Sequence, residues 1–194
     1  MRATDILREE HRWIRDLLDA LAQVVEGAVE TATLDPATPE LLDLFETFAD
    51  HSHQQKEERL LFPRLHQRAR SRDSRVLRRL ENDHDRDRHM MGSMQSNLLG
   101  AVYGEPLCLR QFVEQASSYV RLHQNHMRLE GDKVFVLADE ILTDQDDREL
   151  CARFEHVDSA AFGGRERLHQ RIEQVCLRFR ETRGRTPHRT AESA

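Results

Sequence analysis

The sequence predicts an all-α protein: an antiparallel up-down four-helix bundle with an additional C-terminal helical segment. Four long stretches repeat apolar residues at spacings of three and four, which is the period of an amphipathic helix. Only 8 of the 194 residues are glycine, while 38% are hydrophobic and 33% are charged, and this composition suits helices with wide solvated faces. The links between the stretches are short, which favours antiparallel neighbours.

The first two helices are separated by a proline-containing loop. The first is predicted over about residues 3–30 with Thr4 as its N-cap, because Thr can accept a hydrogen bond from the first turn. Residues 31–40 carry two prolines and several capping residues, so they are expected to form a loop. The second helix then continues to about residue 70, with a kink expected at Pro63.

The third and fourth helices follow the same pattern. The third begins near Asp73 or Ser74 and closes around residues 100–104, where two glycines occur. The fourth follows Pro106, a residue favoured at the first position of a helix.

The pattern is weaker after residue 145. It predicts a short helix near 146–157, a break at Gly163 and Gly164, and a last amphipathic helix through about Phe179. The predicted organisation is therefore a four-helix bundle over residues 1–140, a helical extension over 141–182 that packs on it, and a tail over 183–194. The tail has almost no apolar content, which predicts disorder.

One internal echo links the second and fourth helices. His53 and Glu57 are followed by Leu-Phe, His126 and Glu130 are followed by Val-Phe, and both segments read H-x3-E-x3-[LV]-F. His and Glu at positions i and i+4 lie on the same side of a helix, so each segment can offer a nitrogen and a carboxylate to one point. We interpret the echo as two equivalent halves of one site.

Ionisable side chains interrupt the apolar stripe of every predicted bundle helix. Burying such groups is costly unless they are paired or bind a metal. His11 on the first helix and His84 on the third lie on their own stripes and complete a set of four His and two Glu. Carboxylates that bridge, with imidazoles as terminal ligands, suit two first-row metal ions, with iron the leading candidate, whereas zinc usually takes four ligands in total. Each metal would keep positions for an oxo or hydroxo bridge and for a small ligand.

Four segments resemble the ligand-bearing helices of the hemerythrin or HHE cation-binding family, over about residues 3–138. They read EEHRWI, HQQKEERLLFP, NDHDRDR and HMRLEGDKVF, and the second is similar to bacterial members. The resemblance implies a hemerythrin-like bundle with a non-haem di-iron centre. It further implies one iron on His11 and His53, the other on His84 and His126, and Glu57 and Glu130 as bridges.

The sequence departs from the oxygen-carrying hemerythrins on the third helix. Those proteins have a second histidine one turn after the ligand of this helix, and here that position is Arg88. His89 is one residue further and is rotated off the ligand face by about 100°. The departure favours reaction with, or sensing of, O2, peroxide or nitric oxide over reversible oxygenation.

Three residues near the predicted ligands keep more than one interpretation. His123 shares the stripe of its helix and could contact a ligand, compete as a ligand, or be a core residue bonded to backbone. Tyr119 could donate a hydrogen bond near the site or simply fill the core. Glu58 neighbours Glu57 and is interpreted as solvent-facing or as a salt-bridge partner.

The function expected from these residues is a di-iron protein that binds or reacts with O2, NO or peroxide, in oxidative or nitrosative stress response or in sensing. The alternative is a di-iron enzyme that reduces peroxide or NO or supports repair of iron centres. Oxygen carriage and iron storage are disfavoured. The C-terminal segment is interpreted either as a cap on the bundle or as a homodimer contact.

Composition and charge argue against several classes of partner. The net charge of −6 and the lack of aromatics among the arginines of residues 64–79 argue against a nucleic-acid partner. A run of about 18 apolar residues is missing, so we expect no membrane partner and a cytoplasmic protein. The cysteines Cys108, Cys151 and Cys176 are far apart and are expected to be reduced thiols.

Overall fold

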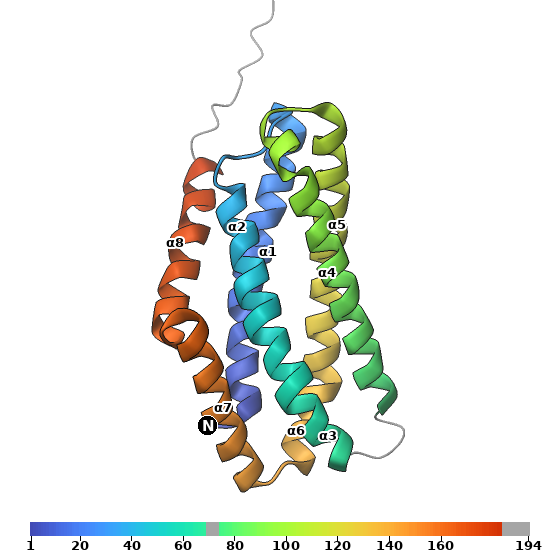
Figure 1. The fold of residues 1–194 in the computed structure, drawn as a ribbon, viewed down its shortest axis with the longest axis vertical. Coiled ribbons are helices and arrows are strands. Elements are labelled where there is room, and N and C mark those ends of the chain that lie inside the picture. The colour runs from blue at the N-terminus through green and yellow to red at the C-terminus, as the bar shows by residue number, and fades with distance from the viewer. Residues whose placement is uncertain (69–73, 184–194) are drawn as a thin grey trace, which may run out of the picture.

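The computed structural model describes residues 1–68 and 74–183, and every regular element within these ranges is a helix. Four long helical runs pass up, down, up and down, packed antiparallel as the sequence predicts (Figure 1). Two further helices follow them. None of the helices in the described ranges is long and apolar enough to cross a membrane.

The first run is α1 (Ala3–Thr31), which matches the predicted range but begins differently. The predicted N-cap, Thr4, is wrong: Arg2 is the extended residue before the helix, and its backbone N–H donates to Asp5 Oδ2 at 2.8 Å. Thr4 lies inside the first turn and is buried. Its hydroxyl donates to Asp139 Oδ1 at 2.6 Å, because a contact with the fourth run is available to it.

The second run consists of α2 (Thr38–Leu44), the π-helical segments η1 (Phe45–Gln54) and η2 (Glu57–Leu61), and α3 (Phe62–Arg68). The helix continues through Pro63. The kink expected at Pro63 stays a prediction, and the π-helical segment η2 ends two residues before the proline. The predicted end near residue 70 lies outside the described residues.

The third run is α4 (Ser74–Val102), and the fourth is α5 (Pro106–Leu129), η3 (Glu130–Val134) and α6 (Phe135–Ile141). The description of α4 begins at Ser74, the first described residue after the gap, and Asp73 lies outside the described residues. Pro106 is itself the first residue of α5. Gly100 lets the two runs approach each other, because a Cβ there would lie 2.6 Å from the Cys108 sulfur.

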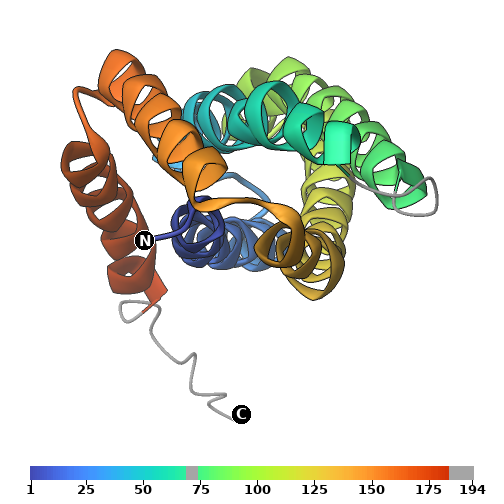
Figure 2. The same ribbon diagram turned by 90° about the horizontal axis from the view of Figure 1, so that it is seen from below.

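The C-terminal helices are α7 (Asp144–Phe162) and α8 (Arg165–Arg183), with the predicted glycine break between them. The predicted range 146–157 is too short. A capping box starts α7 earlier: Thr143 Oγ1 accepts from the backbone N–H of Asp146, whose carboxylate accepts from the N–H of Thr143. The predicted tail lies outside the described residues from 184 on. Both helices pack against α1 and reach the second run (Figure 2).

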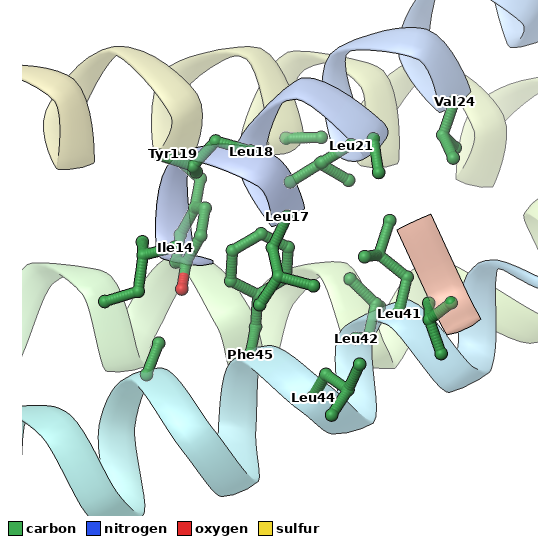
Figure 3. Close-up of a cluster of buried hydrophobic side chains, with 14 of the residues drawn as sticks. Ile14, Leu17, Leu18, Leu21, Val24, Leu41, Leu42, Leu44, Phe45 and Tyr119 are labelled. Carbon is green, nitrogen blue, oxygen red and sulfur yellow. The ribbon is translucent and has the colours of Figure 1, made fainter. Parts of the chain in front are cut away.

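The core of the bundle is divided into two apolar clusters by a layer of polar side chains. On α1, Leu7 belongs to one cluster and Ile14 to the other, and His11 lies between them in sequence. Figure 3 shows part of the larger cluster, in which Leu17 of α1 lies with Phe45 of η1. The polar layer between the clusters is where the predicted site residues lie.

Candidate metal centre

The six residues predicted as metal ligands converge from four helical runs into the interior of the bundle. None is more than 5% exposed. Their potential ligand atoms form two overlapping groups, each with all its atoms within 4.8 Å of one another. The two groups share Glu57 and Glu130. The first group adds His11 from α1 and His53 from η1, and the second adds His84 from α4 and His126 from α5.

Glu57 faces both groups with separate oxygens. Its Oε1 lies 3.6 Å from His53 Nε2, and its Oε2 lies 3.5 Å from His84 Nε2. Each oxygen therefore lies beside a different pair of histidines.

Glu130 repeats this arrangement in the fourth run. Its Oε2 lies 3.2 Å from His11 Nε2, and its Oε1 lies 2.9 Å from His126 Nε2. Two carboxylates that each span the same two groups are the arrangement expected for bridges in a dinuclear site.

The buried polar atoms at this centre fit a metal better than they fit one another. None of the four oxygens of Glu57 and Glu130 has a hydrogen-bond partner in good alignment, and neither does His11 Nε2. His84 Nε2 and His126 Nε2 face each other at 2.9 Å. Buried carboxylates without partners are costly, and a cation between convergent nitrogen and oxygen lone pairs would remove that cost. The donor set therefore supports a dinuclear metal site.

Carboxylates outside the six residues orient the imidazole rings. Glu10 Oε2 lies 2.9 Å from His53 Nδ1, and Glu58 Oε1 lies 2.8 Å from His84 Nδ1. A ring that donates its Nδ1–H outward keeps the Nε2 lone pair directed at the centre.

The sequence pattern does not indicate this role for Glu10, because its partner is on another helix. For Glu58 it predicts only a solvent-facing or ion-pairing residue. The ion pair exists, since Arg88 Nη1 donates to Glu58 Oε1 at 3.1 Å, but the same oxygen also orients His84.

Burial and the neighbouring charges shift the pKa values of the glutamates in opposite directions. Burial, followed by repulsion from Glu130, raises the pKa of Glu57 to about 8. Burial also opposes charge on Glu130, yet His126 and His11 hold the pKa of this carboxyl well below its usual range.

The pKa values of His53 in the first group and of His84 and His126 in the second shift in opposite directions. Burial works against the charged form of His84 and His126, but the nearby glutamates raise the pKa of His84 to about 9 and that of His126 well above its usual value. Burial lowers the pKa of His53 to about 4 in spite of Glu10.

The sequence echo has a counterpart in the backbone. Glu57 is the first residue of η2 and Glu130 the first residue of η3, and each segment is five residues long. Each ends directly before the Phe of its motif. π-Helical turns are rare and occur frequently at functional sites. The two halves of the motif are therefore equivalent in local structure as well as in sequence.

His123 and Tyr119 lie beside the centre and are not members of either group. His123 Nε2 is 2.8 Å from Asp87 Oδ2, and the same oxygen accepts a hydrogen bond from Gln54 at 3.0 Å. The ring of Tyr119 packs edge-on against His123, with centroids 4.5 Å apart. These contacts favour the interpretation of His123 as a neighbour of the ligands.

The α4 positions after His84 provide no fifth histidine facing the centre. Arg88 extends outward to Asp50 and Asp85 as well as to Glu58. His89 is exposed, and its Nδ1 contacts the backbone oxygen of Asp85. The departure noted in the sequence therefore holds in the structure.

The family model of the hemerythrin HHE cation binding domain matches residues 2–138. This range contains all six residues of the centre and ends before α7. Comparisons with curated proteins and with solved structures gave no match.

Proposed function

This chain belongs to the hemerythrin HHE cation-binding domain family, and on that premise we propose that it is a di-iron protein that binds or reacts with O2, NO or peroxide. The observation that carries the proposal is that both glutamates place one oxygen beside the first histidine pair and the other oxygen beside the second. Two glutamates in this position would hold two metals a short distance apart.

Iron fits the donor set better than zinc or magnesium. Each metal would receive two imidazole nitrogens and two carboxylate oxygens, a mixed set typical of first-row transition metals, and magnesium prefers oxygen alone. A single structural zinc takes four protein ligands in total, whereas the six residues here form two groups that share two glutamates. When bound, two irons would supply redox chemistry and open positions for a small ligand.

The residues of the chain would hold, orient and shield that centre. The proposed ligands are His11, His53, Glu57, His84, His126 and Glu130. Glu10 and Glu58 would fix the rings of His53 and His84. Phe62 stacks parallel to His84 at 6.1 Å between centroids, and Phe135 lies 5.1 Å from His11, so that aromatic rings limit access of water. A dry site favours a neutral diatomic ligand or a peroxide over larger polar molecules.

We propose a role in oxidative or nitrosative stress response or sensing. Arg88 supports this role. It stands where oxygen-carrying hemerythrins have a further histidine, and because its guanidinium points outward, one iron would have one ligand fewer and be more open to reaction. The second candidate is an enzyme that reduces peroxide or NO. The observation that favours it is a small, partly open pocket whose lining includes Asp87, Arg88 and Tyr119 but none of the six proposed ligands. Asp87 Oδ2 lies 2.8 Å from His123 Nε2, and reduction would need polar groups of this kind to pass protons towards the centre.

Metal analysis of the purified chain, followed by rapid mixing of the anaerobic ferrous protein with O2, H2O2 or NO, tests the proposal. We expect two irons per chain, lost in His53→Ala and kept in the control His51→Ala, an exposed histidine on the same segment. Repeated turnover with an electron donor would identify the enzyme, and a single spectroscopic change would identify the sensor. One zinc, or no metal, would refute the di-iron proposal.

A further inference from the structure

A buried ionic network lies beside the metal centre and joins the family-matched bundle to α7 and α8. It contains two carboxylates, Glu10 of α1 and Asp158 of α7, and two cations, Lys56 and Arg165. Lys56 and Glu10 have no exposed surface, and Asp158 is 2% exposed. Nothing in the sequence analysis anticipated this network, and the family match ends at residue 138, before two of its members.

Glu10 is the residue that connects the network to the centre. Its Oε2 faces His53 Nδ1 at 2.9 Å, while its Oε1 accepts from Lys56 Nζ and from Arg165 Nη1, each at 2.6 Å. One carboxylate thus orients a proposed ligand with one oxygen and is itself held by two cations through the other.

Asp158 holds the far side of the network. Its Oδ1 accepts from Lys56 Nζ at 2.5 Å and from the Ser52 hydroxyl at 2.9 Å, and its Oδ2 lies 3.5 Å from Arg165. Ser52 immediately precedes His53. The network therefore contacts the ring of His53 through Glu10 and the side chain of the preceding residue through Asp158.

Opposite charges hold the network together. Glu10, Lys56 and Asp158 lie together away from water, and Arg165, whose side chain is 27% exposed, also pairs with the partly exposed Glu9 at 2.9 Å. Loss of one of the three buried members therefore leaves an uncompensated buried charge, which is strongly destabilising for the local arrangement. The guanidinium of Arg165 also lies over the ring of Trp13, 4.5 Å from its centroid, which fixes its position.

The orienting contact of His84, whose Nδ1 also faces a carboxylate, involves neither α7 nor α8. Glu58, the partner of His84, receives its cation from Arg88 of α4, and its side chain is 28% exposed. That arrangement lies within the bundle. Dependence on α7 and α8 is thus a property of the His53 side of the centre.

We propose that α7 and α8 form a positioning element of the metal centre, in which Asp158 and Arg165 hold Glu10 so that Glu10 fixes the ring of His53. This inference rests on the proposed metal site. Because coupling between two sites is reciprocal, metal binding at His53 tightens the docking of α7 and α8 on α1. The C-terminal helices are then able to report the state of the centre to a partner.

The test uses the full-length chain with anaerobic ferrous iron as the probe. Arg165→Met and Asp158→Asn are compared with Arg171→Met and Arg180→Met. The control arginines also join α8 to the bundle, by exposed pairs with Asp43 at 2.6 Å and with Asp16 at 3.0 Å, and neither pair touches the network. Iron affinity is measured by competition with a chelator.

We expect the network variants to bind iron roughly tenfold more weakly than wild type, the scale seen when a residue that orients a metal ligand is lost. The controls are expected to match wild type in affinity even where they lower the unfolding temperature. Arg165→Lys keeps the charge and should restore part of the affinity, which a purely structural role for α8 does not require.

Hydrogen exchange of residues 144–183 provides a second measurement. In the wild-type chain, where no variant has to fold, iron should slow exchange in α7 and α8. In the variants, the effect should be lost in Arg165→Met and kept in Arg171→Met. Iron that binds wild type without changing this exchange, or network variants that bind as tightly as the controls, would overturn the inference. Failure of wild type to bind iron at all would instead overturn the proposed function.

Discussion

Glu57 and Glu130 each begin a π-helical turn, and in each carboxylate one oxygen lies beside a histidine of the first group and the other beside a histidine of the second. They come from the second and fourth helical runs, so the two carboxylates approach the centre from different runs of the bundle. The four oxygens lack aligned hydrogen-bond partners, and both glutamate side chains are fully buried. The arrangement is understandable as a site built for two cations.

The proposed bridging role can be tested by a variant that removes the charge of one glutamate but keeps the size and shape of its side chain. We expect Glu130→Gln to reduce bound iron from two ions to one or none, because an amide is a poor bridging ligand. Iron per chain is measured after anaerobic loading and desalting. Glu140→Gln, an exposed position on the adjoining helix α6, is the control and should keep both ions. Retention of two irons in Glu130→Gln would argue against bridging.

Metal removal is expected to destabilise the fold as a whole. Iron at about 100 times its dissociation constant stabilises the native state by about 2.7 kcal/mol, which corresponds to about 5–10 °C in unfolding temperature for a chain of this size. Thermal unfolding followed by circular dichroism, with and without a chelator, measures this shift. His126→Ala should show the same low unfolding temperature in both conditions, and His51→Ala should shift as wild type does.

The part of the centre that periodicity defines was predictable from the sequence. His11 and His84 lie on apolar stripes, and His-x3-Glu puts two donors one turn apart, so position within a single helix was enough to find them. Glu10 and Lys56 were not predictable, because their partners lie on other helices, with Asp158 more than 100 residues away in sequence. Contacts of this kind leave no periodic signal.

Helix boundaries show the same limit. The start of α7 depends on the reciprocal bonds between Thr143 and Asp146, and these were overlooked because the apolar pattern there is weak. Thr4 looked like a cap, yet its hydroxyl has a partner in Asp139. The π-helical segments were not anticipated, because a repeat of apolar residues does not reveal where the hydrogen-bond spacing widens.

Asp146 predicts how stability depends on pH at the acid end. Its carboxylate is buried and caps α7, and the hydrogen bonds from Thr143, followed by the charges of Arg68 and Arg64, lower its pKa to about 2. Since this value lies below the unfolded value of 3.8, the carboxylate contributes stability above about pH 4 and loses it as the pH falls towards 2.

We therefore expect the metal-free protein to lose about 1 kcal/mol between pH 5 and pH 3 through this group, and Asp146→Asn to lack that part of the loss. Urea unfolding at both pH values gives the difference. Asp144→Asn, an exposed acid in the same helical turn, should follow wild type. Equal losses in wild type and Asp146→Asn would show that the buried cap does not titrate as proposed.

Arg88 offers a test of what distinguishes this chain from an oxygen carrier. It lies one turn after His84 on α4, and its guanidinium contacts Glu58. Arg88→His would offer a further imidazole from the same helix face and fill one open position, so we expect O2 to be bound and released unchanged over more cycles than in wild type. Arg88→Ala removes the guanidinium without adding a donor and serves as the control. Oxygen uptake and the fraction of iron remaining ferrous are followed over successive cycles. If Arg88→His and Arg88→Ala lose ferrous iron at the same rate, the arginine does not set the choice between reaction and carriage.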